Sequence, residues 1–107
     1  MAWSPLRLAQ FVPTATVASY YTADAVTIIK NIVVANTAGF VVPFTLSLVP
    51  SGLTAGNSNR IVPGSGIPAL GTVAFDLTQV MHPGDFIAAF AGTAGVLAVT
   101  VSGMEVS

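Results

Sequence analysis

Apolar and polar residues alternate with a period of two along much of this chain, and the longest such stretch runs from Val26 to Pro50. It consists of two apolar segments, residues 26–35 and 40–49, joined by the turn-forming residues 36–39. The alternation in the second segment is typical of a strand with one face in a core. We therefore expect a β-hairpin, with both segments paired side by side, at the centre of an all-β domain. The alternating residues are Val42, Phe44, Leu46 and Leu48 on one face and Pro43, Thr45 and Ser47 on the other.

The rest of the chain shows the same period in shorter segments, separated by turn signals at intervals of about 8 to 12 residues. The pattern predicts about eight strands in one small antiparallel β-sandwich, jelly-roll-like in organisation, and no window favours a helix. Two stretches rich in turn formers, Pro50–Asn59 and Pro63–Leu70, are predicted to be exposed loops and contact surfaces. The remaining strands are expected at residues 6–12, 16–22, 60–62, 72–77, 86–91 and 96–104, with Val73, Phe75, Leu77, Leu97, Val99 and Val101 pointing inward.

Residues 1–13 are interpreted as an N-terminal arm that includes the first strand, and residues 14–107 as the sandwich domain. The apolar side chains of the arm either dock on the sandwich or reach onto a neighbouring subunit. Trp3 likewise either folds back over a sheet edge or anchors in a neighbour. Tyr20 and Tyr21 are adjacent, so one is expected to point inward and the other toward solvent or a partner. The candidate interface residues are Trp3, Leu6, Leu8, Phe11, Tyr20, Tyr21, Asn57, Asn59 and Arg60.

The charge content indicates a subunit of an assembly rather than a free-standing domain. Only 7% of the 107 residues are Asp, Glu, Lys or Arg, against roughly 25% in ordinary soluble proteins. A surface with so little charge is suited to being covered by further copies or by a larger assembly, so we expect a homo-oligomer. The net charge of -1, with three basic residues, offers no footprint for phosphates and argues against nucleic-acid binding.

Membrane insertion is not predicted, although 53% of the residues are hydrophobic. The uncharged window from Asn31 to Asn59 is long enough to span a bilayer, but it contains Pro43 and Pro50 and its period is two. Residues 1–5 show no charged region followed by an apolar run, so no Sec-type signal is expected. This sequence contains no cysteine, which excludes disulfides and thiolate metal sites within it.

No combination of residues suggests catalysis, and we expect neither an enzyme nor a bound metal or cofactor. The one histidine, His82, precedes Pro83-Gly84-Asp85 in a turn signature. The carboxylates are scattered without the spacing of a calcium loop. Residues 64–69 imitate a Gly-x-Gly-x-x-Ala phosphate loop, but Pro68 interrupts them and no helical pattern follows. A glycan-binding surface stays an alternative, with Tyr20, Tyr21 or Trp3 stacking beside the polar residues Asn57, Asn59 and Arg60.

Four stretches combine strand and turn residues in a distinctive order. They are TIIKNIVVANTAG at 27–39, LVPSG at 48–52 with NRI at 59–61, VMHPGDFI at 80–87, and VSGME at 101–105. This order resembles that of a group of small virion proteins of tailed bacteriophages. In that group an Ile-rich strand ends in an Asn-Thr turn, and a Val-Pro-Ser-Gly loop, a Pro-Gly-Asp turn and a terminal Val-Ser-Gly strand follow. The match covers most of the chain from about Pro5 onward.

The resemblance implies a non-enzymatic structural protein of the virion, assembled in the host cytoplasm, and favours a capsid decoration or cement subunit. Decoration proteins of this kind commonly sit as homotrimers over capsid joints, where they bind the major capsid protein and stabilise the shell. Tail, collar and baseplate accessory proteins use similar sandwiches as adaptors, which leaves a tail position as the alternative. No catalytic residue is carried over from the group.

Overall fold

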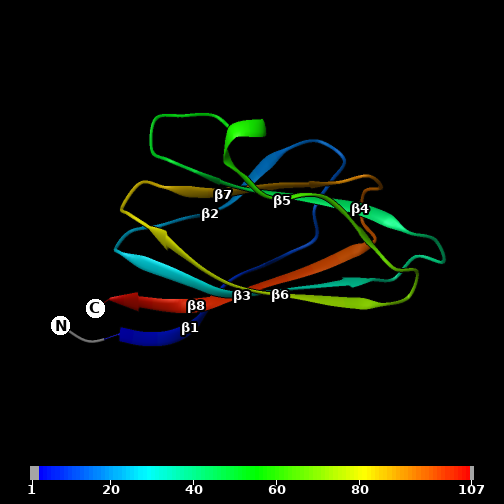
Figure 1. Ribbon diagram of the computed structural model, residues 1–107, viewed down its shortest axis with the longest axis horizontal. Coiled ribbons are helices and arrows are strands. Elements are labelled where there is room, and N and C mark those ends of the chain that lie inside the picture. The colour runs from blue at the N-terminus through cyan, green and yellow to red at the C-terminus, as the bar shows by residue number, and fades with distance from the viewer. Residues whose placement is uncertain (1–2, 107) are drawn as a thin grey trace.

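The computed structural model describes residues 3–106 and, among these, every side chain but those of residues 3, 4, 6, 57 and 106. It is a sandwich of two four-stranded sheets, with extents of 45, 26 and 18 Å (Figure 1). One single-turn 3-10 helix, η1 (Asn57–Asn59), is the only helical element in these residues. The strands are β1 (Trp3–Phe11), β2 (Ala18–Thr22), β3 (Thr27–Asn36), β4 (Val42–Val49), β5 (Arg60–Ile67), β6 (Thr72–Met81), β7 (Phe86–Ala91) and β8 (Leu97–Val106).

Each sheet combines strands from both halves of the chain. One sheet has the order β1-β8-β3-β6 and the other the order β2-β7-β4-β5, and every neighbouring pair is antiparallel. Successive strands therefore lie in different sheets, except where the chain passes from β4 to β5 within one sheet. This strand order is that of a jelly roll. The predicted fold, an all-β jelly-roll-like sandwich of about eight strands, is confirmed.

The pairing predicted for the central hairpin is wrong, although both of its strands exist. β3 lies between β8 and β6, whereas β4 lies between β7 and β5 in the other sheet. Each strand has one strongly apolar face, and the connection 37–41 crosses between the sheets, so that these faces meet across the core. Alternation identifies a strand and its buried face, but it does not identify the neighbour to which the strand is hydrogen-bonded.

The core fills the space between the two sheets, and the inward positions follow the sequence pattern. β6 alternates between exposed and half-buried residues from Thr72 to Val80, as its sequence predicts. β8 contributes Leu97, Val99 and Val101, all nearly or fully buried. The largest fully buried side chains are Phe44, Ile29, Ile32, Leu46, Ile67, Met81, Ile87, Leu97, Val34, Val42, Val49 and Val62.

β5 is longer than predicted, because it continues through a stretch that the sequence analysis interpreted as a loop. Pro63 and Gly64 lie inside this strand, and Gly64 has a positive φ of 69°. β5 is an edge strand paired only with β4, and its register shifts twice along that pair. An edge strand tolerates proline and bulges, since its outer side needs no ladder hydrogen bonds.

The two adjacent tyrosines do not point to opposite faces. The register between β2 and β7 shifts between Ser19 and Tyr21, which leaves Tyr20 at a bulge. Tyr20 and Tyr21 are consequently both half-buried and both packed against the core. The prediction failed because a bulge inserts one residue into the alternation and so reverses the side on which the next residue lies.

The N-terminal arm is docked as a strand of the sandwich. β1 pairs with β8 from Trp3 opposite Val106 to Phe11 opposite Val99, with one register shift around Leu8. Leu8 itself is only 8% exposed and belongs to the core. Of the two alternatives for this segment, the structure therefore shows docking on its own sandwich for residues 3–11.

Candidate interaction surface

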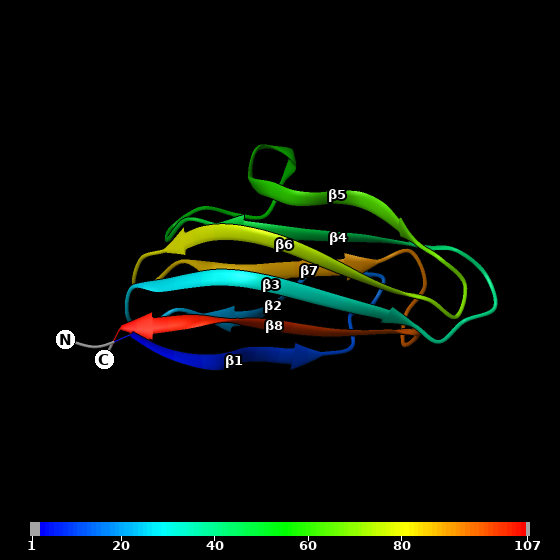
Figure 2. The ribbon, with the colours of Figure 1, turned by 60° about the horizontal axis from the view of Figure 1, so that its bottom comes forward.

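Four connections meet at the end of the sandwich that lies opposite the two chain termini (Figure 2). They are the β1–β2, β3–β4, β5–β6 and β7–β8 connections. None of their residues is Asp, Glu, Lys, Arg or His. We call this surface the uncharged end and define it as residues 12–17, 37–41, 68–71 and 92–96.

Hydrogen bonds join the four connections into one unit. The β7–β8 connection contacts both the β1–β2 and the β3–β4 connections, and the β3–β4 connection also contacts the β5–β6 connection. Because each connection is bonded to at least one other, the uncharged end is a single surface rather than four separate loops. The backbone bonds run from Gly95 N–H to Pro13 O (3.4 Å), from Thr37 N–H to Val96 O (2.9 Å), and from Leu70 N–H to Ala38 O (3.0 Å).

Asn36, the last residue of β3, holds the base of this surface. Its side chain is buried, with 4% exposed. The Nδ2 group donates to the carbonyl oxygens of Phe40 at 2.8 Å and Ile67 at 3.0 Å, and Oδ1 accepts from the N–H of Ala38 at 2.9 Å. One amide thus ties the β3–β4 connection to the end of β5.

Most of the exposed large apolar side chains in the described residues lie on the uncharged end. Leu70 is 76% exposed and Val41 is 62% exposed. The only polar side chains here are threonine hydroxyls, and those of Thr14 and Thr37 donate to the carbonyls of Thr16 and Val96. The surface therefore offers apolar contact and little polar recognition. Its exposed large apolar residues are Val12, Val17, Phe40, Val41 and Leu70.

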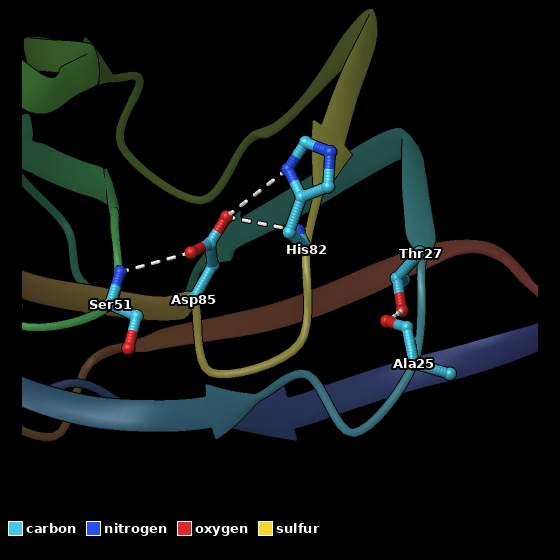
Figure 3. Close-up of polar contacts among 5 residues, drawn as sticks. All are labelled: Ala25, Thr27, Ser51, His82 and Asp85. Atoms are coloured by element: carbon cyan, nitrogen blue, oxygen red, sulfur yellow. Dashed lines mark hydrogen bonds and ion pairs between the residues drawn. The ribbon is translucent and has the colours of Figure 1, made fainter.

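The opposite end carries charge, and we call it the charged end, residues 23–26, 50–56 and 82–85. Asp85 organises it, as Figure 3 shows: Oδ1 accepts from Ser51 N–H and Oδ2 from His82 N–H, both at 2.9 Å. The His82 Nδ1 atom lies 3.9 Å from the same Oδ2. The hydrogen bonds from His82 and Ser51 lower the pKa of Asp85 below its ordinary value of 3.8. Thr27 caps the neighbouring connection by donating to the carbonyl of Ala25 (Figure 3).

Three of the predicted interface residues close the flank between β1 and β2. The rings of Phe11 and Tyr20 stack with their centroids 4.1 Å apart and their planes 7° from parallel. The Tyr21 hydroxyl donates to Oε2 of Glu105 at 3.3 Å. Burial raises the pKa of Tyr21 above its ordinary value of 10.0, and the negative charge of Glu105 adds to that rise. These side chains pack between the two sheets. Contacts within the chain therefore explain why aromatic residues stand at these positions, and contact with another protein is not needed to explain them.

The structure does not bring together the predicted glycan-binding residues. Tyr20 and Tyr21 lie on β2 and Arg60 on β5, which are opposite edges of one sheet with β7 and β4 between them. Arg60 lies over the ring of Phe90, 5.6 Å from its centroid. The Asn59 side chain bonds to Gly56 N–H and Thr54 O, so its amide holds the 50–59 connection together. The three remaining candidates, the side chains of Trp3, Leu6 and Asn57, lie outside the described residues.

The described residues give no indication of an active site. Within residues 3–106 there is no pocket, and no group of three or more His, Cys, Asp or Glu side chains could hold a metal ion. The same part of the chain contains no helix of the length and hydropathy needed to cross a bilayer.

The sequence analysis predicted part of the uncharged end, because Pro63–Leu70 was expected to be an exposed contact surface, but it missed the other three connections. Phe40 and Val41 were assigned to a strand, and Leu70 to the end of a glycine-rich loop. A signal was present, since the four connections share an absence of charge and an excess of Val, Ala, Gly and Thr. Recognising that they form one surface requires the topology, which brings together segments from all parts of the chain.

Comparison with known proteins yields likenesses of fold only. No family model and no curated protein matches the sequence. A solved structure of a subunit from Bacillus endospore appendages, described as disulfide-linked pili, superposes with a TM-score of 0.60 at 13% identity. That match covers 99% of this chain and 88% of the appendage chain.

A second solved structure with a similar fold comes from a virus. A chain of infectious bursal disease virus, Gx strain, matches with a TM-score of 0.55 and 11% identity. The match covers 97% of this chain but 32% of the viral chain, so the present sequence spans about a third of that protein. Because this sequence has no cysteine, these residues cannot form the disulfide links described for the appendage.

Proposed function

We propose that this chain is a non-enzymatic structural protein of a virion, a decoration subunit that binds an assembled head shell in many symmetric copies and stabilises it. Its partners are the major capsid protein and further copies of itself, as a trimer, with no nucleic acid and no membrane. It acts on the virion surface and is assembled in the host cytoplasm.

The observation that carries this proposal is the uncharged end. An apolar surface whose connections are joined by hydrogen bonds and carry no charge is costly to leave in water and favourable to bury against protein. A small subunit with such a surface is suited to a particle in which each contact is repeated many times, because repetition turns weak contacts into strong attachment. The bacteriophage resemblance and the likeness in fold to proteins of a pilus and a virus support the same class.

The proposal is tested on virions that carry this chain and on matched particles that lack it. We expect the purified protein to bind the deficient particles at regular positions on the head, visible by electron cryomicroscopy. Bound particles should release their genome at a higher temperature than bare ones, since every bound copy stabilises the assembled state. Particles that neither bind the protein nor change in heat stability would show that it is not a decoration subunit.

A position in the neck, tail or baseplate is the second candidate. The charge content of 7% favours it, because a subunit enclosed by other proteins needs less charge than one exposed on a head. Density for the chain confined to the neck or tail in the same images would establish this location instead.

A further inference from the structure

We propose that copies of this chain bind one another through their uncharged ends, like surface against like surface around a symmetry axis. This inference goes beyond the proposed function, since it concerns the contact between copies. It can be tested on the isolated protein, so its failure is distinct from a failure to bind particles.

The distribution of charge determines which surface can face the uncharged end. All seven Asp, Glu, Lys and Arg residues of the sequence lie on other surfaces of the molecule. An ion that is buried against an apolar surface loses its hydration and gains no counter-charge, at a cost of several kcal/mol. The best match for a surface without charge is therefore another surface without charge.

Two of the other surfaces of the same chain are unsuitable partners. The charged end would place Asp24, His82 and Asp85 against an apolar contact. The outer face of the β1-β8-β3-β6 sheet presents the exposed side chains of Lys30, from the middle strand β3, and Asp76, from the edge strand β6. Stacking the uncharged end on either one would remove ionic groups from water without pairing them.

The chain itself covers the outer face of the second sheet over β4, and the edge strand β5 of this sheet carries the exposed and charged Arg60. Thr45 and Ser47 alternate with the core residues of β4 and therefore lie on its outer side, yet both are buried. η1 packs against β4, and the connection that carries it passes over this sheet (Figure 1). The remaining surface that matches the uncharged end is the uncharged end of another copy.

The symmetry of this contact determines the kind of assembly. When the same end of every copy faces one symmetry axis, the contact closes there and gives an oligomer of fixed size, which is a dimer about a twofold axis or the proposed trimer about a threefold axis. Contact between opposite ends is heterologous, and it gives a filament unless the rotation from copy to copy closes a ring. The charge distribution thus favours a discrete oligomer over a fibre.

The size of the uncharged end sets the expected strength of the contact. The molecule measures 26 by 18 Å across its long axis. The end therefore presents roughly 500 Å² per copy, less than the roughly 800 Å² that each partner contributes to a stable interface of standard size. We expect self-association that is reversible and concentration-dependent in the isolated protein and is reinforced when copies are held on a particle.

The test is sedimentation velocity of the purified chain over a range of concentrations up to its solubility limit, compared with two variants. Leu70→Lys places a charge on the uncharged end, and Leu53→Lys makes the same change at a side chain that is 59% exposed at the charged end. Because both side chains project into solvent, neither substitution disturbs the core, and circular dichroism will verify this. Leu70 has a positive φ of 54°, so its replacement could change the local backbone as well as the charge. Phe40→Lys is therefore a second variant that places a charge on the uncharged end at a different position.

We expect the wild-type chain and Leu53→Lys to form the same discrete oligomer. Leu70→Lys and Phe40→Lys should weaken self-association at least about tenfold, because each buries an unpaired charge. Added sodium chloride should leave the wild-type oligomer intact, since no charges meet across the contact.

Three results would overturn the inference. The wild-type chain could stay monomeric up to its solubility limit, Leu53→Lys could weaken association as much as Leu70→Lys does, or electron micrographs could show filaments. A wild-type monomer that floats with uncharged phosphatidylcholine vesicles, while Leu70→Lys does not, would assign the surface to a lipid bilayer instead.

Discussion

Replacing the buried Asn36 by alanine should be among the most destabilising single substitutions near the connections of this protein. The substitution removes three hydrogen bonds, two donated by Nδ2 and one accepted by Oδ1. A net value of about 1 kcal/mol for each gives roughly 3 kcal/mol. Ala38 and Ile67 are both buried, so an N–H and a carbonyl are left without a partner and without water, which adds about 1 to 2 kcal/mol.

The expected loss of roughly 4 to 5 kcal/mol is large against the total stability of about 5 to 15 kcal/mol for a domain of ordinary size. Asn31→Ala is the matched control, since Asn31 lies on the same strand and makes one exposed hydrogen bond, to Asp76 Oδ1 at 2.8 Å. Its loss should cost at most about 0.5 kcal/mol.

Urea unfolding of the wild type and the two variants, followed by tryptophan fluorescence and circular dichroism, measures these differences. A difference between Asn36→Ala and Asn31→Ala of less than about 1 kcal/mol would refute the reasoning, because it would mean that the buried amide is not what holds the connections together. Asn36→Asp provides a further check: it keeps the acceptor for Ala38 N–H but turns a second oxygen toward two carbonyls. We expect it to be no more stable than the alanine variant.

Three further predictions concern other parts of the sandwich. Gly103→Ala should cost about 3 kcal/mol in urea unfolding, since a Cβ there would collide with backbone atoms of β3, whereas Gly39→Ala, with open space around it, should be nearly neutral. The pKa of Asp85 is lowered in the folded state, so the stability that its carboxylate contributes is present above its ordinary pKa of 3.8 and is lost as the pH falls through the folded-state pKa. In acid titrations the stability difference between wild type and Asp85→Asn should therefore shrink below about pH 4. A stability difference that is independent of pH would contradict this. A double-mutant cycle of Phe11→Leu and Tyr20→Leu should give a coupling free energy of about 0.5 to 1.5 kcal/mol, and additive losses would mean that the stack joins nothing.

The strands could be predicted from the sequence because their chemistry is local. A period of two with one apolar face appears in the sequences of β4, β6 and β8, and in β6 and β8 it matches the burial of alternate side chains. The pairing of β3 and β4 could not be predicted in this way, since alternation is the same for a hairpin and for two strands that face each other across a core. Pro63 and Gly64 were misleading, because they are turn formers in most settings but are tolerated in an edge strand.

The candidate surface was less predictable than the fold. Its residues are separated by up to about 80 positions along the chain, and each one alone is an ordinary apolar residue near the end of a strand. Tyr20 and Tyr21 were predicted to be interface residues because large aromatic residues are common at interfaces. In the structure they close the flank of the sandwich between β1 and β2. A surface that is defined by the absence of charge is not detected by a search for reactive side chains.

The pairing of Trp3 with Val106 has a practical consequence for anything attached to this protein. Any additional segment, whether a natural extension, an affinity tag or a fluorescent label, leaves the domain at one place, on the side away from the uncharged end (Figure 2). Labels at either terminus will therefore leave that surface free. Joining the two ends by a short linker and opening the chain in the 50–56 connection should likewise keep every strand of both sheets, which makes this jelly roll a candidate for circular permutation and for carrying foreign peptides on its charged end.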